Sequence, residues 1–173
     1  RAGRRPDLLV GDLDSTDPAL VERLERAGTS VERHPTEKDA SDTELALTAA
    51  RSRGATEIVV LGALGGLRVD HELATLLLLA DASFAGLAVR IVRGGTTVRP
   101  LRDGERLALD AGAGDVVSLL PIGGDATGIT TSGLRWPLDG ATLQFGRSRG
   151  LSNEVVEAPA SVSLERGTLL VVH

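Results

Sequence analysis

The chain has 173 residues, of which 42% are hydrophobic and 25% charged, so it can form one domain or two small ones with an ordinary core. Its net charge of −5 argues against a nucleic-acid groove, which would need a basic face. The lack of cysteine excludes disulfides, thiolate metal sites and a cysteine nucleophile. The apolar run at residues 76–80 is too short to span a bilayer and no signal peptide is visible. We therefore expect a cytoplasmic protein with neither nucleic acid nor a membrane as partner.

The first half of the chain alternates predicted strands and helices. Strands are expected at residues 7–10, 30–33, 57–61 and 87–92, the third of them buried because Ile-Val-Val-Leu is a continuous apolar run. Helices are expected from Asp17-Pro18 to Gly28, from the capping box Ser41-Asp-Thr-Glu44 to about Arg53, and from a cap at Asp70 to about Ala82. Repeated strand–helix units predict a doubly wound parallel sheet.

From about Gly94 onward the sequence changes to short β runs separated by Gly, Asp and Pro. Strands are expected at residues 98–101, 106–109, 116–120, 142–145, 155–157, 162–164 and 169–172. Such spacing predicts a small antiparallel sandwich. The expected fold class is therefore α/β. A doubly wound parallel-sheet domain is predicted over residues 1–103 and a small antiparallel β-sandwich domain over residues 104–173.

Acidic residues follow the hydrophobic runs of the first half, where parallel strands share one ligand-binding edge. Asp12 and Asp14 lie two residues apart, so both can point into a cleft if the backbone stays extended. Carboxylates gathered at one edge repel each other unless a cation or a basic substrate lies among them, and this pair suits Mg²⁺. The alternative is a turn that precedes the helix at Asp17.

A second acidic motif surrounds the start of the second predicted helix. Asp39 and Asp42 are three residues apart and are expected on one side of the first helical turn. Ordinary first-turn acids, favoured by the helix dipole, are the alternative to a ligand-binding pair. Lys38, the single lysine of the chain, comes directly before them and suits phosphate as a point charge, or else offsets the acids.

A glycine-rich turn, Gly62-Ala-Leu-Gly65-Gly66, separates the third predicted strand from the third helix. Such turns let backbone amides approach phosphate. It is not a Walker A loop, because no Gly-Lys-Ser/Thr follows, and its glycine spacing differs from that of a dinucleotide fingerprint. Arg68, Asp70 and His71 follow the turn, and we expect His71 to be a structural or orienting group.

Taken in order, these motifs resemble those of the thiamine pyrophosphokinase (thiamine diphosphokinase) family. The resemblance lies in PDLLVGDLDS at residues 6–15, EKDASD at 37–42 and GALGGLRVDH at 62–71. It continues with SLLPI at 118–122, GITTSGLRWPL at 128–138 and GLSNE at 150–154. No single motif is decisive, but the ordered set is specific and covers nearly the whole chain.

The resemblance implies an enzyme that transfers diphosphate from ATP to the hydroxyl of thiamine, releasing AMP, with Mg²⁺ as cofactor. It also implies an α/β catalytic domain, a β-sandwich that binds thiamine, and a homodimer with shared active sites. The family's catalytic positions fall on Asp12, Asp14, Asp39, Asp42, Arg68 and Asp70. The implied metal ligands are Asp12, Asp14, Asp42 and Asp70. The implied ATP-binding positions are Lys38, Gly65, Gly66 and Arg68, and those for thiamine are Trp136, Ser152 and Asn153.

Elementary chemistry agrees with these roles. Phosphoryl-type transfer depends on metal ions and positioning, and Arg68 and Lys38 suit the transferred charge. A cleft carboxylate, not assigned to one residue, would accept the alcohol proton. Trp136, the only tryptophan, would attract the thiazolium cation by roughly 0.5–2 kcal/mol, unless it is ordinary core or interface packing. Ser152 and Asn153 would bond the aminopyrimidine, or otherwise form a turn.

The chain departs from the family pattern in several places. The usual first strand–helix unit with its Ala-Asp-Gly-Gly signature is not found in the sequence. Together with the lack of methionine, this leads us to expect either a fragment of a longer chain or a missing segment that is supplied from elsewhere. Leu67 is an extra residue before Arg68, Thr75 stands where Asn is frequent, and Leu13 stands where Phe is usual.

Two other functions stay open from the sequence. Asp12-Leu-Asp14-Ser-Thr fits the first motif of a haloacid-dehalogenase-like phosphatase, with Asp12 as nucleophile and Asp14 as acid/base. The other is a thiamine- or nucleotide-binding protein without catalytic activity.

Overall fold

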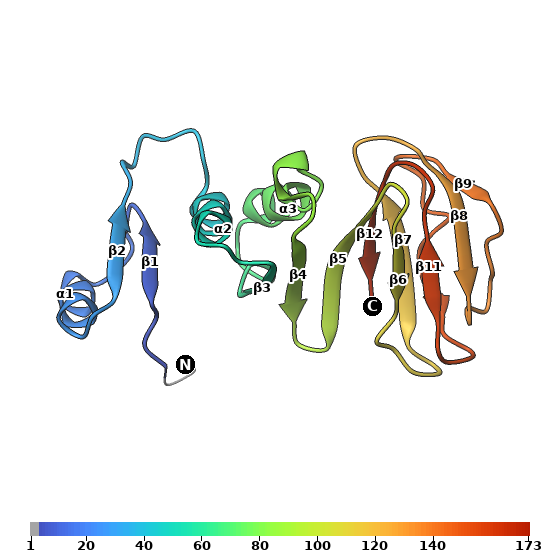
Figure 1. Ribbon diagram of the computed structural model, residues 1–173, viewed down its shortest axis with the longest axis horizontal. Coiled ribbons are helices and arrows are strands. Elements are labelled where there is room, and N and C mark those ends of the chain that lie inside the picture. Colours follow the sequence, from blue (N-terminus) through green and yellow to red (C-terminus); the bar gives the residue numbers. More distant parts are fainter. Residues whose placement is uncertain (1–3) are drawn as a thin grey trace. The chain divides into compact units, whose positions relative to one another are not determined.

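The computed structural model describes residues 4–173. By packing, the chain divides into two compact units, the first ending at Thr56 and the second beginning at Glu57 (Figure 1). Residues 4–56 of the first unit contain two strands and two helices, and the second unit contains most of the strands.

The first unit is built on a parallel pair of strands. β1 (Leu8–Gly11) pairs with β2 (Ser30–Arg33), with Leu8 opposite Ser30 and Gly11 opposite Arg33. α1 (Pro18–Arg26) forms the crossover between them, and α2 (Asp42–Ser52) packs against β1. Parallel strands need such a helical crossover, because a tight turn cannot return the chain to the same end of the sheet.

Both helices of this unit begin at the expected capping residues. The Asp17 side chain accepts a hydrogen bond from the Ala19 N–H at 3.0 Å, directly before Pro18 at the first helical position. Ser41 Oγ accepts from the Glu44 N–H at 3.2 Å. These bonds satisfy amides that have no partner within the helix, which confirms both predicted helix starts.

The second unit contains a six-stranded sheet in the order β10-β7-β12-β5-β4-β3. Its strands are β3 (Glu57–Leu61), β4 (Ala88–Arg93), β5 (Thr96–Arg102), β7 (Val116–Pro121), β10 (Asn153–Glu154) and β12 (Thr168–Val172). β3 and β4 run parallel and are connected through α3 (Val69–Leu78) and the short 3-10 helix η1 (Ala82–Phe84). All other neighbours in this sheet pair antiparallel.

A four-stranded antiparallel sheet completes the second unit. It has the order β6-β11-β8-β9, with β6 (Arg106–Ala108), β8 (Ala126–Ser132), β9 (Ala141–Leu143) and β11 (Ser161–Ser163). Strands of both sheets contribute to one buried core, which includes Leu119, Ile129, Val162 and Leu169. Burial of such side chains contributes roughly 1.5–3 kcal/mol each relative to exposure.

The chain is thus a mixed α/β protein, whose two parallel strand pairs lie in different units. The doubly wound parallel sheet expected for residues 1–103 stays a prediction. The two parallel pairs, β1–β2 and β3–β4, belong to different sheets. A two-residue turn at Gly94 and Gly95 returns β4 directly into β5, so this pair is antiparallel. The resulting mixed sheet includes strands from both sides of residue 103, and the packing division falls after Thr56. The predicted domain boundary at residue 103 stays a prediction.

Two details of the second unit correct the sequence predictions. α3 begins at Val69 and ends at Leu78, so Asp70 lies inside its first turn rather than capping it. β8 was not predicted, because its Ala-Thr-Gly-Ile-Thr-Thr-Ser sequence is largely polar.

Within the described residues, no helix has the length and apolar character to cross a membrane.

Candidate active site

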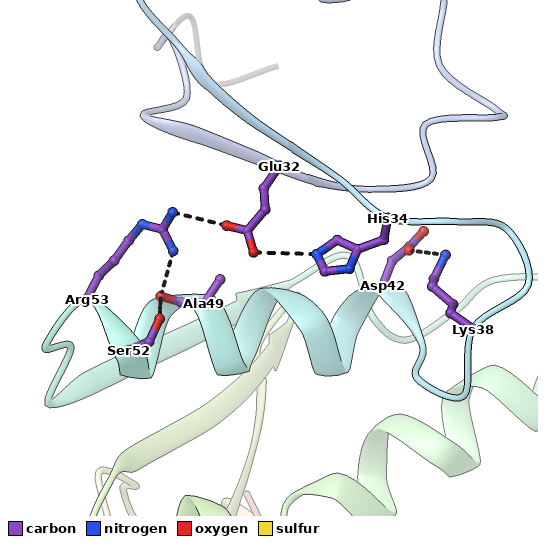
Figure 2. Close-up of polar contacts among 7 residues, drawn as sticks. All are labelled: Glu32, His34, Lys38, Asp42, Ala49, Ser52 and Arg53. Atoms are coloured by element: carbon purple, nitrogen blue, oxygen red, sulfur yellow. Dashed lines mark hydrogen bonds and ion pairs between the residues drawn. The ribbon is translucent and has the colours of Figure 1, made fainter.

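Lys38 lies between two aspartates of the first unit. Its Nζ is 2.7 Å from Oδ2 of Asp12 and 3.1 Å from Oδ1 of Asp42; Figure 2 shows the second contact. The side chains of Lys38 and Asp12 are each only 14% exposed. The hydrogen bond from the ammonium lowers the pKa of Asp12, and the same bond raises the pKa of Lys38.

The end of β1 and the start of α2 bring these groups together. Gly11, the last residue of β1, has φ +142°, and a Cβ atom there would lie 3.0 Å from Oδ1 of Asp42. Glycine therefore leaves room for the carboxylate directly over the strand end. Asp42 is the first residue of α2, where the helix dipole favours a negative charge.

The backbone between Asp12 and Asp14 is a turn. Leu13 has φ +59°, the Asp14 N–H donates to Oδ1 of Asp12 at 3.2 Å, and the Thr16 N–H donates to the Leu13 carbonyl at 3.0 Å. The extended backbone required for two carboxylates to point into one cleft is therefore not present. Asp12 still presents its second oxygen to Lys38, whereas Asp14 is exposed.

Asp39 lies before the helix on whose first turn it was expected to lie beside Asp42. α2 starts at Asp42 after the cap Ser41, so Asp39 precedes the cap and is exposed. The expectation that Asp39 and Asp42 share the first turn is wrong, because Ser41 takes the capping position between them. Of the two, it is Asp42 that contacts Lys38.

A line of polar contacts joins β2 to α2 and was not found from the sequence (Figure 2). Arg53 donates to Oε2 of Glu32 at 3.1 Å, and His34 Nε2 lies 3.4 Å from Oε1 of the same carboxylate. Arg53 also donates to the Ala49 carbonyl at 3.2 Å. The Arg53 hydrogen bond lowers the pKa of Glu32. These contacts connect β2 to the helix whose first residue carries the Asp42 carboxylate.

In the second unit, Arg68 and Asp70 form a two-pronged ion pair at the start of α3. Arg68 Nε donates to Oδ1 of Asp70 at 2.9 Å, and its Nη2 donates to Oδ2 at 2.5 Å. The guanidinium holds the pKa of Asp70 well below its usual range. Both side chains are more than 60% exposed, so this pair contributes little to stability but is free to meet a ligand.

The glycine turn before α3 is held by two side chains. The Gly65 N–H donates to Oε1 of Glu72 at 2.6 Å, so the amide expected to face phosphate is already bonded. Gly65 has φ +90°, and a Cβ atom there would lie 2.7 Å from the guanidinium of Arg93. Gly66 is exposed and has no such close neighbour. The packing of Arg93 on Gly65 could not be found from sequence, because 28 positions separate them.

Trp136 and Asn153 are joined through the Trp136 backbone. Asn153 Nδ2 donates to the Trp136 carbonyl at 2.7 Å, while its Oδ1 accepts from the N–H of Trp136 at 3.1 Å and from that of Glu154 at 2.9 Å. Trp136 is 58% exposed, so it is not a core residue, and the guanidinium of Arg135 lies 5.9 Å from its ring centroid. The exposed indole is available to a ligand.

Trp136, Ser152 and Asn153 line one pocket of about 380 Å³ in the second unit. Leu119, Leu138 and Leu151 add apolar walls, and Arg149 adds a charge. Gly150 is required here, because a Cβ atom at this position would lie 2.0 Å from the Leu119 carbonyl oxygen. Ser152 has φ +57°, and its backbone N–H donates to Ser118 Oγ at 3.0 Å. The residue is exposed, so its side-chain hydroxyl can reach a ligand.

The first unit has oxygen donors that fit Mg²⁺. Asp12 Oδ2 and Asp42 Oδ1 converge on one point, the Lys38 ammonium. Residues 4–173 contain no group of three or more His, Cys, Asp or Glu side chains arranged to hold a metal ion. Two carboxylates agree with the usual Mg²⁺ mode, in which waters and substrate phosphates complete the shell. Asp70 belongs to the second unit, where Arg68 pairs with it.

Two family models match the chain. "Thiamin pyrophosphokinase, catalytic domain" matches residues 1–91, and "Thiamin pyrophosphokinase, vitamin B1 binding domain" matches residues 106–169. A thiamine pyrophosphokinase of Bacillus subtilis is 26% identical over 172 residues, which are 99% of this chain and 80% of that protein. Thiamine pyrophosphokinase 1 of rice, Oryza sativa subsp. japonica, is 27% identical over 168 residues. There the match covers 92% of this chain but only 62% of the relative.

Solved structures agree with the sequence comparison. The crystal structure of the Bacillus subtilis thiamine pyrophosphokinase matches with a TM-score of 0.85 at 26% identity, over 99% of this chain and 80% of that one. The structure from Geobacillus thermodenitrificans matches with a TM-score of 0.77 at 29% identity, over 98% and 78% of the two chains. Because the catalytic-domain model alone covers more than half of its residues, this chain belongs to the thiamine pyrophosphokinase family.

Proposed function

We propose that this chain transfers diphosphate from ATP to the hydroxyl of thiamine, giving thiamine diphosphate and AMP. The observation that carries the proposal is that one chain matches the family's catalytic domain over residues 1–91 and its vitamin B1 binding domain over residues 106–169. Matches to both domains, in this order, give the chain a segment for each substrate.

On the ATP side, Mg²⁺ would neutralise phosphate charge and hold the β-phosphorus in line with the attacking oxygen. Asp12 and Asp42 are the first candidates to hold it, because their oxygens converge. Asp14 and Asp70 are further candidate ligands. Asp39, which is exposed beside the cluster, remains a candidate to accept the hydroxyl proton.

Cationic and backbone donors would orient the phosphates. Lys38 and Arg68 carry positive charge beside the acidic positions, and each suits a phosphate oxygen. In the glycine turn, Gly66 is exposed and its amide could donate to a phosphate. The Gly65 amide instead donates to Glu72 and stabilises the turn. The transferred charge would then be spread over the metal and these donors.

On the thiamine side, the pocket beside Trp136 is the proposed binding site. The exposed indole face suits the thiazolium cation. The hydroxyl of Ser152 suits the aminopyrimidine, whereas Asn153 supports the site through the Trp136 backbone. We assign ATP and Mg²⁺ to residues 1–103 and thiamine to residues 104–173. The single buried core between the six-stranded and the four-stranded sheet supports the description of residues 104–173 as a β-sandwich.

Three wider properties belong to the proposal. The protein would act in the cytoplasm as a homodimer with shared active sites, and its partners would be thiamine and ATP rather than nucleic acid or a membrane. The net charge of −5 agrees with the absence of a nucleic-acid partner. Neither the phosphatase nor the inactive binding protein gains support from the family models.

The test is AMP formation from ATP and Mg²⁺, with and without thiamine. The proposal predicts thiamine-dependent AMP together with an equal amount of thiamine diphosphate. Inorganic phosphate released from phosphate monoesters without ATP would instead identify a phosphatase. Thiamine binding without AMP would identify a binding protein.

A further inference from the structure

We infer that Lys38 is a tethered cation that occupies the metal position between Asp12 and Asp42, and that Mg²⁺ displaces its ammonium toward the phosphates of ATP. The inference rests on the proposed function and deepens it, because it assigns one side chain two successive positions in the same site. It also explains why a lysine lies inside an acidic motif.

The geometry of the contacts is the first step. Lys38 Nζ is within hydrogen-bond distance of one oxygen of each carboxylate, at 2.7 Å and 3.1 Å. A divalent cation bound to the same two oxygens would need the volume that the ammonium fills, since Mg²⁺ lies at about 2.0–2.1 Å from its ligands. The ammonium and the metal therefore cannot use these two oxygens together.

Electrostatics gives the direction of exchange. If the ammonium kept its contact with Asp12 while Mg²⁺ bound the same oxygen, the two cations would lie within about 5 Å of each other. Like charges at this separation repel strongly in a site that is only 14% exposed at Lys38 and Asp12. Because Mg²⁺ carries two charges, the two carboxylates attract it more strongly than they attract the ammonium. The ammonium is therefore displaced.

The surroundings of Lys38 permit this movement. Asp12 directly follows β1, where its Oδ1 accepts from the Asp14 N–H, and Asp42 is the first residue of α2, so both carboxylates have a fixed backbone. Lys38 lies between β2 and α2 in a segment without helix or strand, and its four-carbon side chain can turn about its own bonds. The freed ammonium could then contact the phosphates of a bound ATP, whose negative charge would lie between it and the metal.

The exchange has a signature that a purely structural lysine would not give. Removal of the Lys38 charge should strengthen binding of Mg²⁺ alone, because the metal no longer competes with the ammonium. The same change should weaken binding of the Mg²⁺ complex of α,β-methylene-ATP, because a phosphate contact is lost. A structural lysine would change neither affinity, or would weaken both through misfolding.

The first experiment follows Lys38 directly. Since it is the only lysine, growth with ¹³C- and ¹⁵N-labelled lysine places the label at this residue alone. We expect the Cε and Nζ signals to shift on addition of Mg²⁺, and to shift again with the α,β-methylene-ATP complex. Unchanged Lys38 signals at a concentration where Mg²⁺ is bound, measured by calorimetry, would overturn the inference.

The second experiment compares Lys38→Gln with Arg26→Gln, a matched loss of one positive charge at a residue that is 78% exposed on α1. Lys38→Gln should bind Mg²⁺ roughly three- to tenfold more tightly than the unchanged chain, as expected for the loss of two competing ion pairs. Arg26→Gln should bind it unchanged. Equal or weaker Mg²⁺ binding by a folded Lys38→Gln variant would contradict the inference.

These measurements separate the inference from the proposed function. Neither contains thiamine or requires turnover, so a chain without diphosphokinase activity can still show displacement of Lys38 by Mg²⁺. Conversely, an active chain whose Lys38 signals do not respond to Mg²⁺ would refute the exchange alone. If Lys38→Gln does not fold, the labelled natural chain decides the question without it.

Discussion

The side-chain amide of Asn153 is bonded on both sides to the backbone of Trp136. Its Nδ2 donates to the Trp136 carbonyl at 2.7 Å, and its Oδ1 accepts from the Trp136 N–H at 3.1 Å. Asn153 is buried, while the indole is 58% exposed. A buried polar group therefore fixes the backbone from which an exposed aromatic ring reaches the pocket, which prepares the ring for a ligand at little entropic cost.

Asn153→Ala should lower the free energy of unfolding by about 1–3 kcal/mol, because the Trp136 N–H and carbonyl lose their hydrogen bonds to the Asn153 side chain. It should also raise the KM for thiamine more than it lowers kcat, and change the fluorescence of Trp136, the only tryptophan. Chemical denaturation, steady-state kinetics and emission spectra measure these effects. Gln144→Ala removes an exposed amide and should alter stability by less than about 0.5 kcal/mol. Equal effects from the two variants would show that the Asn153 bonds are unimportant.

Trp136→Leu should weaken thiamine binding by roughly 2- to 30-fold, corresponding to the loss of one cation–π contact. Phe145→Leu is the matched control, since Phe145 is 59% exposed and does not line the pocket. Calorimetric titration with thiamine distinguishes them. Should both variants bind thiamine as the natural chain does, the pocket beside Trp136 is not the thiamine site.

Asp12→Asn should reduce kcat/KM by about 100-fold or more, because a neutral amide is a poor Mg²⁺ ligand and leaves the Lys38 charge less compensated. Asp17→Asn makes the same charge change at the cap of α1, where Asn serves as well as Asp. Its activity should stay within about twofold of the natural chain. AMP release measures both, and a fully active Asp12→Asn variant would remove Asp12 from the site.

The pair of Asp12 and Lys38 should make stability depend on pH at both extremes. The folded pKa of Asp12 is lowered, so its contribution is present above the unfolded value of about 3.9 and is lost as the pH falls through the folded pKa. The pKa of Lys38 is raised, so its contribution is present below about 10.4 and is lost as the pH rises through the folded pKa.

Denaturation of the natural chain and of Asp12→Asn across the pH range measures this contribution. The difference in their unfolding free energies should be constant from about pH 5 to 9 and shrink on either side. A difference that does not change between strongly acidic and strongly alkaline solution would contradict the ion pair.

Gly65→Ala should destabilise the turn before α3 by at least about 1 kcal/mol, because φ is +90° and the new Cβ would meet the Arg93 guanidinium. Gly66→Ala has open space at its Cβ position and should change stability by less than about 0.5 kcal/mol. Thermal or chemical unfolding compares the two. If Gly66→Ala were the more damaging substitution, the described turn geometry would be incorrect.

Local chemistry could be predicted from the sequence where a few neighbouring residues determine it. The Asp17 and Ser41 caps depend on residues within three positions, and both helix starts were predicted correctly. The strands at 30–33 and 57–61 also agree with the structure. The second of them follows from a local apolar run, Ile58 to Leu61. The positive φ of Leu13 was not predicted. The sequence around Asp12 fits a turn as well as an extended strand end, so the sequence alone does not distinguish the two.

Features that depend on residues distant in sequence were missed. The two-sided bond from Asn153 to Trp136, the packing of Arg93 on Gly65 and the Glu32–Arg53 pair each join different elements. The antiparallel pairing of β5 with β12 also joins segments distant in sequence, and the periodicity of a single sequence does not encode such pairing. The acidic positions were found, but the placement of Lys38 between Asp12 and Asp42 needed the structure.

The most direct measurement of the central claim is the fate of the β-phosphorus of ATP in a reaction with Mg²⁺ and thiamine. With ATP labelled at this position, the diphosphokinase account predicts that all transferred label appears in thiamine diphosphate, with unlabelled AMP as the second product. Label that appears in ADP or in inorganic phosphate, with none in thiamine diphosphate, would contradict the account.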